Sequence, residues 1–193
     1  RAEIIKLREK IDTTFVYVTH DQVEAMTLGD RIVIMRDGFI QQIGTPQEVF
    51  NHPANLFVAG FIGTPQMNFF NATLTKKGDK YVATILGHDV ELPEEKQQAL
   101  KNMSDVPTSV IVGVRPVHIH LADEGIDATV DVSELMGSEL HLHVRSGDQD
   151  VVIVVPTTDV DLNAVHGGHK AIKYTFRPEL MHFFYTDTEK NLF

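Results

Sequence analysis

His20 is the residue of this chain with the clearest potential for chemistry. It follows residues 15–18, Phe-Val-Tyr-Val, whose apolar and β-branched side chains are typical of a short strand buried on both faces. In open α/β sheets, ligands bind beyond the carboxyl ends of the strands. An imidazole placed there can donate or accept a hydrogen bond, and its ordinary pKa lies near ~6.5. The alternative is a histidine that only closes a strand and contacts no substrate.

Two His-x-His pairs, at 118–120 and 141–143, raise the question of a metal site. On a strand, both rings of such a pair point to one face, which is a geometry that can chelate zinc or copper. Ordinary alternation explains the pairs equally well, because Ile119 and Leu142 would then face the core. We therefore expect no metal site. The loop 161–169, with two more histidines, is expected to be a polar loop.

Composition limits the classes of protein to which the chain can belong. Its 193 residues are 42% hydrophobic and 23% charged, as in ordinary globular proteins, and none is a cysteine that could form a disulfide. The longest uninterrupted apolar run, 151–155, is far shorter than the ~18 to 20 residues of a membrane span. Residues 67–193 carry 11 basic and 19 acidic side chains. This acidity makes nucleic acid an unfavourable ligand.

The first 63 residues have the pattern of helices mixed with strands. A helix is expected over residues 1–10, where apolar residues share one face. Asp21, with Glu24 three residues later, predicts a capping box that opens a short helix ending at Gly29.

A hairpin and two helices are expected next. Strands 31–35 and 39–43 are joined by Asp37-Gly38, whose residues tolerate the positive φ of a tight turn. The stretch 45–48, Thr-Pro-Gln-Glu, combines an N-cap, a proline at the first helical position and a glutamate at the third. It predicts a helix through about residue 51, and another helix is expected over 54–61.

Beyond an expected hinge at 63–65, the pattern changes to short strands separated by turns, which predicts a small all-β barrel or sandwich. One helix is expected there, over 94–101. Arg-Pro ends two of the strands, at 115–116 and 177–178, and this weak similarity suggests an internal duplication. The expected strands are 69–75, 81–85, 109–114, 126–135, 139–144, 150–155, 171–176 and 181–185.

Residues 17–26, Tyr-Val-Thr-His-Asp-Gln-Val-Glu-Ala-Met, resemble the switch-histidine segment (H-loop) of ATP-binding-cassette (ABC) ATPases. The likeness is to the ATPases that energise carbohydrate importers of the maltose and multiple-sugar type, and it covers most of the chain. It continues through the stretches 29–35, 57–63, 67–69, 113–116 and 134–139.

This resemblance implies a catalytic, nucleotide-binding role for His20. In the family, the equivalent histidine lies against the γ-phosphate of ATP and orients the attacking water and the catalytic carboxylate across a dimer interface. An imidazole suits this role because phosphoryl transfer depends on positioned hydrogen-bond donors. ATP and Mg²⁺ are the cofactors implied for the full-length protein. The general base should be a glutamate upstream of Arg1, so no glutamate of this chain is assigned that role.

The motifs that should hold the nucleotide phosphates are missing from this sequence. It begins at Arg1 without an initiator methionine and contains no Gly-x-x-x-x-Gly-Lys-[Ser/Thr] loop and no signature loop. We therefore expect the carboxyl-terminal part of a longer ATPase, inactive by itself and without a cofactor. Because strand 15–18 would lack its neighbours, we also expect residues 1–63 to be rearranged, partly disordered or covered by a second chain.

The resemblance also implies two domains. Residues 1–63 would be the α/β tail of the ABC nucleotide-binding domain. Residues 64–193 would be an all-β, OB-like, transport-associated (TOBE) regulatory domain that helps dimerisation. Relatives usually have glutamate after Arg-Pro, whereas Val117 stands there in this chain. The motif positions expected to be structural are Gly113, Arg115, Pro116, Gly137, Glu139 and Pro178.

The full-length protein implied is the ATP-hydrolysing subunit of an ABC sugar importer. It would be a homodimer bound to two membrane-spanning permease subunits, peripheral on the cytoplasmic face of the cell membrane, and its second domain would offer a site for a regulatory protein. Two alternatives stay open. A stand-alone OB-like module for small ligands or oxyanions such as molybdate would want backbone N–H nests and positive charge. A single-stranded nucleic-acid binder would want a basic groove with exposed aromatic residues.

Overall fold

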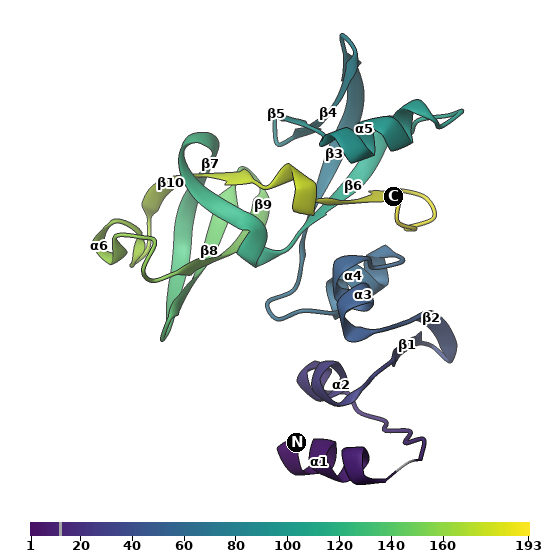
Figure 1. Ribbon diagram of the computed structural model, residues 1–193. Helices are drawn as coiled ribbons and strands as arrows, with labels where there is room; N and C mark the ends of the chain where they lie inside the picture. The colour runs from purple at the N-terminus through teal and green to yellow at the C-terminus, as the bar shows by residue number, and fades with distance from the viewer. Residues whose placement is uncertain (12) are drawn as a thin grey trace. The chain divides into compact units, whose positions relative to one another are not determined.

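The computed structural model describes residues 1–11 and 13–193, and the chain divides into two compact units, residues 1–64 and 65–193. The division falls inside the stretch 63–65, where the sequence pattern changes. The elements of both units are drawn in Figure 1. No helix among the described residues is long and apolar enough to cross a membrane.

The first unit contains four short helices and one β-hairpin. Strands β1 (Ile32–Arg36) and β2 (Phe39–Gly44) pair antiparallel. Asp37 and Gly38 join them with φ of 52° and 83°, which is the two-residue turn that the sequence predicts. The helices are α1 (Ala2–Lys10), α2 (Gln22–Leu28), α3 (Pro46–Asn51) and α4 (Leu56–Phe61).

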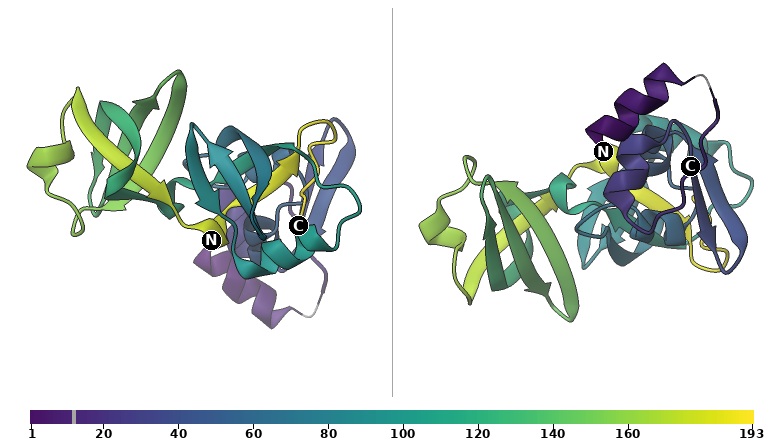
Figure 2. Two further views of the ribbon diagram at one scale, coloured as in Figure 1. Left: turned by 90° about the horizontal axis from the view of Figure 1, so that it is seen from above. Right: turned by 90° about the horizontal axis from the view of Figure 1, so that it is seen from below.

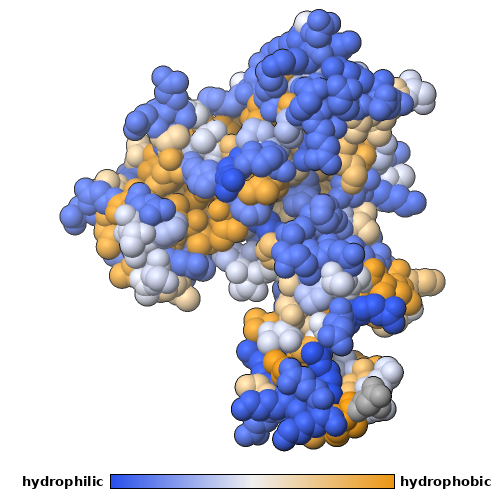
Figure 3. Space-filling view, viewed as in Figure 1, coloured by the Kyte–Doolittle hydropathy of each residue, from blue (hydrophilic) through white to orange (hydrophobic). Residues whose placement is uncertain are grey.

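The hairpin of the first unit has apolar side chains on both of its faces. Ile32 and Ile34 are buried against Val49 of α3 and Val58 of α4. The other apolar side chains of the hairpin are exposed, and Figure 3 shows an apolar patch over β1 and β2. Strands with apolar residues on both faces are typical of sheets covered on both sides. The exposed residues are Val33, Met35, Phe39, Ile40 and Ile43.

The strand expected at residues 15–18 is not formed, so this prediction is wrong for the present chain. Residues 14–19 take no regular secondary structure, and Val16 and Val18 are 89% and 90% exposed. A strand forms only where neighbouring backbone satisfies its N–H and C=O groups. Among the described residues, no segment pairs with 15–18. Residues 15–18 therefore have the composition of a strand but do not form one in this chain.

The second unit consists of two antiparallel sheets (Figures 1 and 2). Strand order is β11-β6-β3-β4-β5 in the five-stranded sheet and β10-β7-β8-β9 in the four-stranded sheet. Two helices accompany them, α5 (Glu94–Lys101) and α6 (Leu162–Val165). The strands are β3 (Asn68–Lys77), β4 (Lys80–Ile85), β5 (His88–Glu91), β6 (Ser109–Val114), β7 (Ile119–Met136), β8 (Glu139–Ser146), β9 (Gln149–Pro156), β10 (Lys170–Phe176) and β11 (His182–Tyr185).

The chain passes between the two sheets at two short 3₁₀ turns. Turn η1 (Pro116–His118) leads from β6 to β7, and turn η2 (Pro178–Leu180) leads from β10 back to β11. The turns are neighbours because Ile119, directly after η1, pairs with Phe176, two residues before η2. Both sheets contribute to one hydrophobic core. This all-β arrangement is the fold class expected for the second half of the chain.

Two buried side-chain amides complete the edges of these sheets. Gln97 of α5 accepts a hydrogen bond from the N–H of Tyr81 (2.7 Å) and donates to the carbonyls of Tyr81 (2.8 Å) and Leu92 (3.0 Å). Asn68 accepts from the N–H of Val152 and donates to its carbonyl, both at 2.8 Å. Each amide takes the place of a strand neighbour, so backbone groups that would be unpaired are satisfied.

The structure departs from the predicted strands of this unit in three places. Strand β5 was not predicted, because His-Asp-Val-Glu lacks an apolar pattern; it forms where the edge of β4 offers partners. Strand β7 begins at Ile119 rather than 126, since residues 122–126 bulge out between two paired segments. Helix α6 forms one short turn inside the loop expected at 161–169.

Candidate functional site

A hydrogen-bond network fixes the turn that holds His20. Thr19 Oγ1 donates to the Glu24 carboxylate (2.7 Å) and accepts from the N–H of Asp21 (3.0 Å). The Tyr17 hydroxyl donates to the same carboxylate at 3.2 Å, and this hydrogen bond raises the pKa of Tyr17. The backbone is therefore tied down on both sides of His20.

Asp21 is the N-cap of α2. Its Oδ1 accepts from the N–H groups of Val23 (2.8 Å) and Glu24 (3.2 Å), two of the donors that a helix leaves unpaired at its start. Of the capping box predicted from Asp21 and Glu24, only the half in which the Asp21 side chain caps the helix backbone forms. The Glu24 carboxylate turns instead to Tyr17 and Thr19, because the N–H of Asp21 is already bonded to Thr19.

The imidazole of His20 is exposed and makes no hydrogen bond or ion pair within the described part of the chain. It is a free donor or acceptor on a fixed turn, which is the arrangement that positions a group for an incoming ligand. The acids beside it, Asp21 and Glu24, are engaged in the turn and would repel phosphate. The sequence has no phosphate-binding loop. These residues alone therefore do not form a site that could hold the phosphates of a nucleotide.

Three motif positions of the second unit have structural explanations. A Cβ at Gly113 would lie 2.5 Å from Sδ of the buried Met67, so a larger residue there would have to displace this side chain. Gly137 forms the turn between β7 and β8 at φ +74°, where a side chain would strain the backbone. Glu139 begins β8 and contacts His141, with 3.4 Å between carboxylate and imidazole.

Arg115 and Arg177 occupy equivalent places at the two crossovers, each followed by the proline that opens the 3₁₀ turn, Pro116 or Pro178. Arg115 is buried, and burial lowers its pKa to about 10, so it stays charged at neutral pH. Arg177 is half exposed and lies 2.9 Å from the Glu179 carboxylate. In η1, Val117 stands where Glu179 stands in η2.

The His-x-His pairs are not gathered into a metal site in the described residues. His118 lies in η1 rather than on a strand, so the alternation expected for His118 and His120 does not apply there. On β8 the expected alternation is confirmed: Leu142 is in the core, and His143 faces outward with its Nε2 3.0 Å from the Glu134 carboxylate. Among the described residues, no group of three or more His, Cys, Asp or Glu side chains could hold a metal ion.

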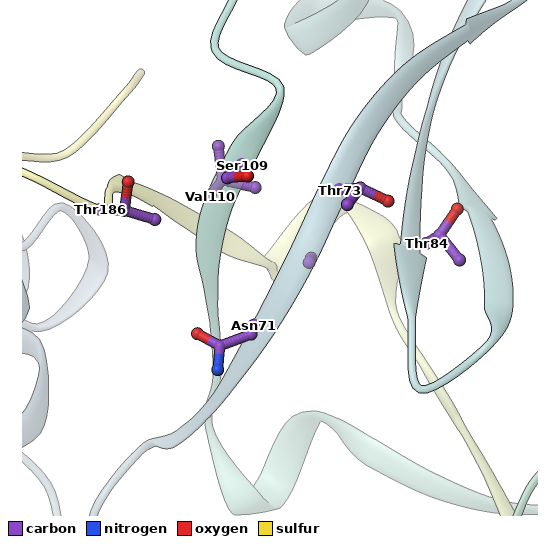
Figure 4. Close-up of a pocket in the computed structure, with 7 residues that line it drawn as sticks. Asn71, Thr73, Thr84, Ser109, Val110 and Thr186 are labelled. Carbon is purple, nitrogen blue, oxygen red and sulfur yellow. The ribbon is translucent and has the colours of Figure 1, made fainter.

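A shallow hollow lies on the five-stranded sheet, with a volume of about 350 Å³ (Figure 4). Thr73 of β3 pairs with Thr84 of β4 on one side and with Ser109 of β6 on the other, so three hydroxyl groups line up across neighbouring strands. The lining offers hydrogen bonds but no charged group and no nucleophile activated by a base. It is formed by Asn71, Ala72, Thr73, Thr84, Ser109, Val110 and Thr186.

Two known domain families match the chain beyond the first unit. The MalK OB fold domain matches residues 63–119, and the TOBE domain matches residues 112–184. The first match ends where the chain enters the four-stranded sheet, and the second covers that sheet together with β11.

Known proteins match nearly the whole chain. YcjV of Escherichia coli O6:K15:H31, an ABC transporter ATP-binding protein, is 44% identical over 192 residues, which are 98% of this chain and 51% of YcjV. YurJ of Bacillus subtilis, also an ABC transporter ATP-binding protein, is 38% identical over 100% of this chain and 53% of its own length. The chain is thus similar to ABC transporter ATP-binding proteins over nearly its whole length.

Two further similarities complete the comparison. The oligosaccharides import ATP-binding protein MsmX of Bacillus subtilis is 40% identical over 98% of the chain and 52% of its own length. The chain thus spans about half the length of these relatives. A structure of the cytoplasmic molybdate-binding protein ModG with molybdate bound is 12% identical and covers 60% of this chain and 94% of its own, with a TM-score of 0.45. At that score it supports no statement about a ligand.

Sequence reasoning missed several residues that hold this chain's fold together. Asn68 and Gln97 have the polarity of surface residues, and only their burial and bonding show otherwise. The bonds from Tyr17 and Thr19 to Glu24 span seven and five residues and match no common capping signature. Two signals could have placed these amides near a core. Asn68 begins the alternating series that continues with the buried residues of β3, and Gln97 lies three residues before the buried Leu100 on the same helix.

Proposed function

We propose that this chain is the carboxyl-terminal portion of the ATP-binding and ATP-hydrolysing subunit of an ABC sugar importer. The observation that supports it best is the match with ABC transporter ATP-binding proteins over 98% of the chain. Sugar as the cargo rests on MsmX, whose name states oligosaccharide import. Residues 1–63 belong to the nucleotide-binding domain in this proposal, and residues 64–193 form the regulatory domain.

His20 is the catalytic residue of this proposal. Its exposed imidazole on a fixed turn supports a role in contacting the nucleotide, which the rest of the full-length subunit would hold. ATP with Mg²⁺ supplies the phosphoryl group and the charge neutralisation when bound. Thr19, Asp21 and Glu24 act as positioning residues, because they fix the backbone on either side of His20.

The complete subunit would work as a homodimer attached to two permease subunits on the cytoplasmic face of the membrane. The family match and the OB and TOBE domains support this assembly, since such subunits act with permeases. The regulatory domain would contribute to dimerisation and offer a surface to a regulatory protein.

The test is ATP hydrolysis by the full-length subunit assembled with its permeases. His20→Ala and His20→Gln should lower turnover about 100-fold or more, the usual cost of losing a group that stabilises the transition state. His52→Ala, which removes another exposed histidine of the first unit, should retain activity. Normal turnover by His20→Ala, in a subunit that assembles normally, would contradict the role of His20. Uptake of labelled oligosaccharides tests the cargo, and tight saturable binding of molybdate to the chain would favour the oxyanion module instead.

A further inference from the structure

His118 is a half-buried side chain whose Nδ1 the fold leaves without a hydrogen-bond partner. It ends turn η1, where the chain leaves the five-stranded sheet for the four-stranded sheet. Its Nδ1 is buried, and no other buried side-chain nitrogen or oxygen of the described residues lacks a hydrogen-bond partner. In the neutral imidazole, this Nδ1 can be the lone-pair atom, with the proton on Nε2. The neutral ring is therefore the form that the site tolerates at least cost.

The charges around His118 are mostly positive. Arg115 precedes it on the same crossover, Arg177 lies at the neighbouring crossover, and His120 follows on β7. Glu179 is the one carboxylate acting on it, and this carboxylate is paired with Arg177 at 2.9 Å. Burial first, and then these cationic neighbours, lower the pKa of His118 below its usual value.

Among the described residues, no carboxylate other than Glu179 acts on His118. Turn η1 packs against β9, whose one titratable side chain is Asp150. That carboxylate is engaged by Arg145 at 2.9 Å. A protonated His118 would therefore add an N–H without an acceptor and a further positive charge beside two guanidinium groups. Both effects oppose the folded crossover.

We propose that His118 makes the η1 crossover a proton-sensitive joint between the two sheets. The joint is closed when the imidazole is neutral and loosens when the imidazole binds a proton. Loosening would reach η2 as well, because Ile119 and Phe176, which flank the two turns, are paired in the same ladder. The rest of each sheet has its own ladders and does not depend on this histidine.

The sign of the pH dependence follows from linkage. A histidine with a lowered folded-state pKa binds its proton more readily in the unfolded state, so stability falls with falling pH. The loss begins near the unfolded value of ~6.5 and ends at the folded-state pKa. One proton changes the unfolding equilibrium constant by at most about tenfold for each pH unit in this window.

The direct test combines a histidine titration by NMR with hydrogen exchange of the full chain between pH 7.5 and 5. His118 should titrate below ~6.5, the ordinary value of a histidine, and amides of residues 115–120 and 176–180 should lose protection before those of β3 and β8. In His118→Gln, which stays neutral, this selective loss should disappear after correction for intrinsic exchange. His143→Gln, a control at an exposed histidine of β8, should retain it.

A second variant tests the joint without removing the histidine. Val117→Glu gives η1 the carboxylate that η2 has in Glu179, at a position that is 48% exposed. It should raise the pKa of His118 and shrink the loss of protection, since a nearby negative charge favours the imidazolium. The proposal is overturned if His118 titrates at or above ~6.5, or if protection at the crossovers falls equally in wild type and Val117→Glu. If His118→Gln does not fold, the titration of His118 in the wild-type chain still tests the proposal.

Discussion

Replacing Gln97 by alanine should cost far more stability than replacing its neighbour Gln98. Gln97 is 3% exposed and makes three hydrogen bonds to the backbone of Tyr81 and Leu92. The Tyr81 carbonyl keeps another donor, the N–H of Leu92 at 3.3 Å. Alanine therefore leaves the N–H of Tyr81 and the carbonyl of Leu92 unpaired, each costing about 1–3 kcal/mol if it stays buried.

The expected loss for Gln97→Ala is thus about 2–4 kcal/mol in the free energy of unfolding, allowing for partial access of water. Gln98 is the control, because it lies on the same helix, is exposed and bonds only to Glu94. Its replacement by alanine should change stability by less than about 0.5 kcal/mol. Urea denaturation followed by circular dichroism measures both. Hydrogen exchange should localise the loss to β4 and β5.

The isosteric change Gln97→Glu sharpens the test. A carboxylate can accept from the N–H of Tyr81 but would face the Leu92 carbonyl without a proton to share. The stability that this variant loses relative to wild type should be larger at pH 7 than at pH 4, where a protonated acid regains one donor. Equal stability of the Gln97→Ala and Gln98→Ala variants would refute the reasoning that the amide substitutes for a strand.

Three further substitutions test backbone features of the structure, namely two positive φ angles and one helix cap. Gly125→Ala should destabilise the second unit by at least about 3 kcal/mol, because φ is +148° and a Cβ would lie 2.3 Å from the Tyr174 carbonyl oxygen; thermal unfolding measures the loss. Leu86→Asn should stabilise by about 0.5–1 kcal/mol, since Leu86 has φ 48° in the two-residue turn before β5, a position that favours asparagine; its urea midpoint should rise. Asp21→Ala should cost α2 about 1 kcal/mol and speed amide exchange at Val23 and Glu24.

Local chemistry made several elements predictable from the sequence. Thr45 forms the predicted capping box with Glu48, and Asp37-Gly38 forms the predicted turn, because both depend on residues within three positions of each other. Helix α5 also has the predicted bounds, since its pattern lies within the helix itself. The family resemblance is confirmed by the OB and TOBE matches.

The wrong predictions concern features that depend on distant partners. Residues 15–18 have the composition of a strand, but pairing needs a second segment alongside, and the described residues do not provide one. Strand β5 shows the reverse case. Its polar sequence has no strand pattern, but it forms a strand because β4 offers backbone partners alongside. His20 remains a prediction, because its role depends on a nucleotide held by other parts of a full-length subunit.

The pairing of Ile119 with Phe176 has a consequence for how the length of this chain can vary among its relatives. The whole four-stranded sheet is an insertion between β6 and β11, and the chain enters and leaves it at these two paired residues. Changes of length within residues 120–175 can therefore accumulate without moving the point at which β11 docks beside β6. A chimaera that exchanges the four-stranded sheet between relatives needs only two junctions. Both junctions lie at the paired residues Ile119 and Phe176.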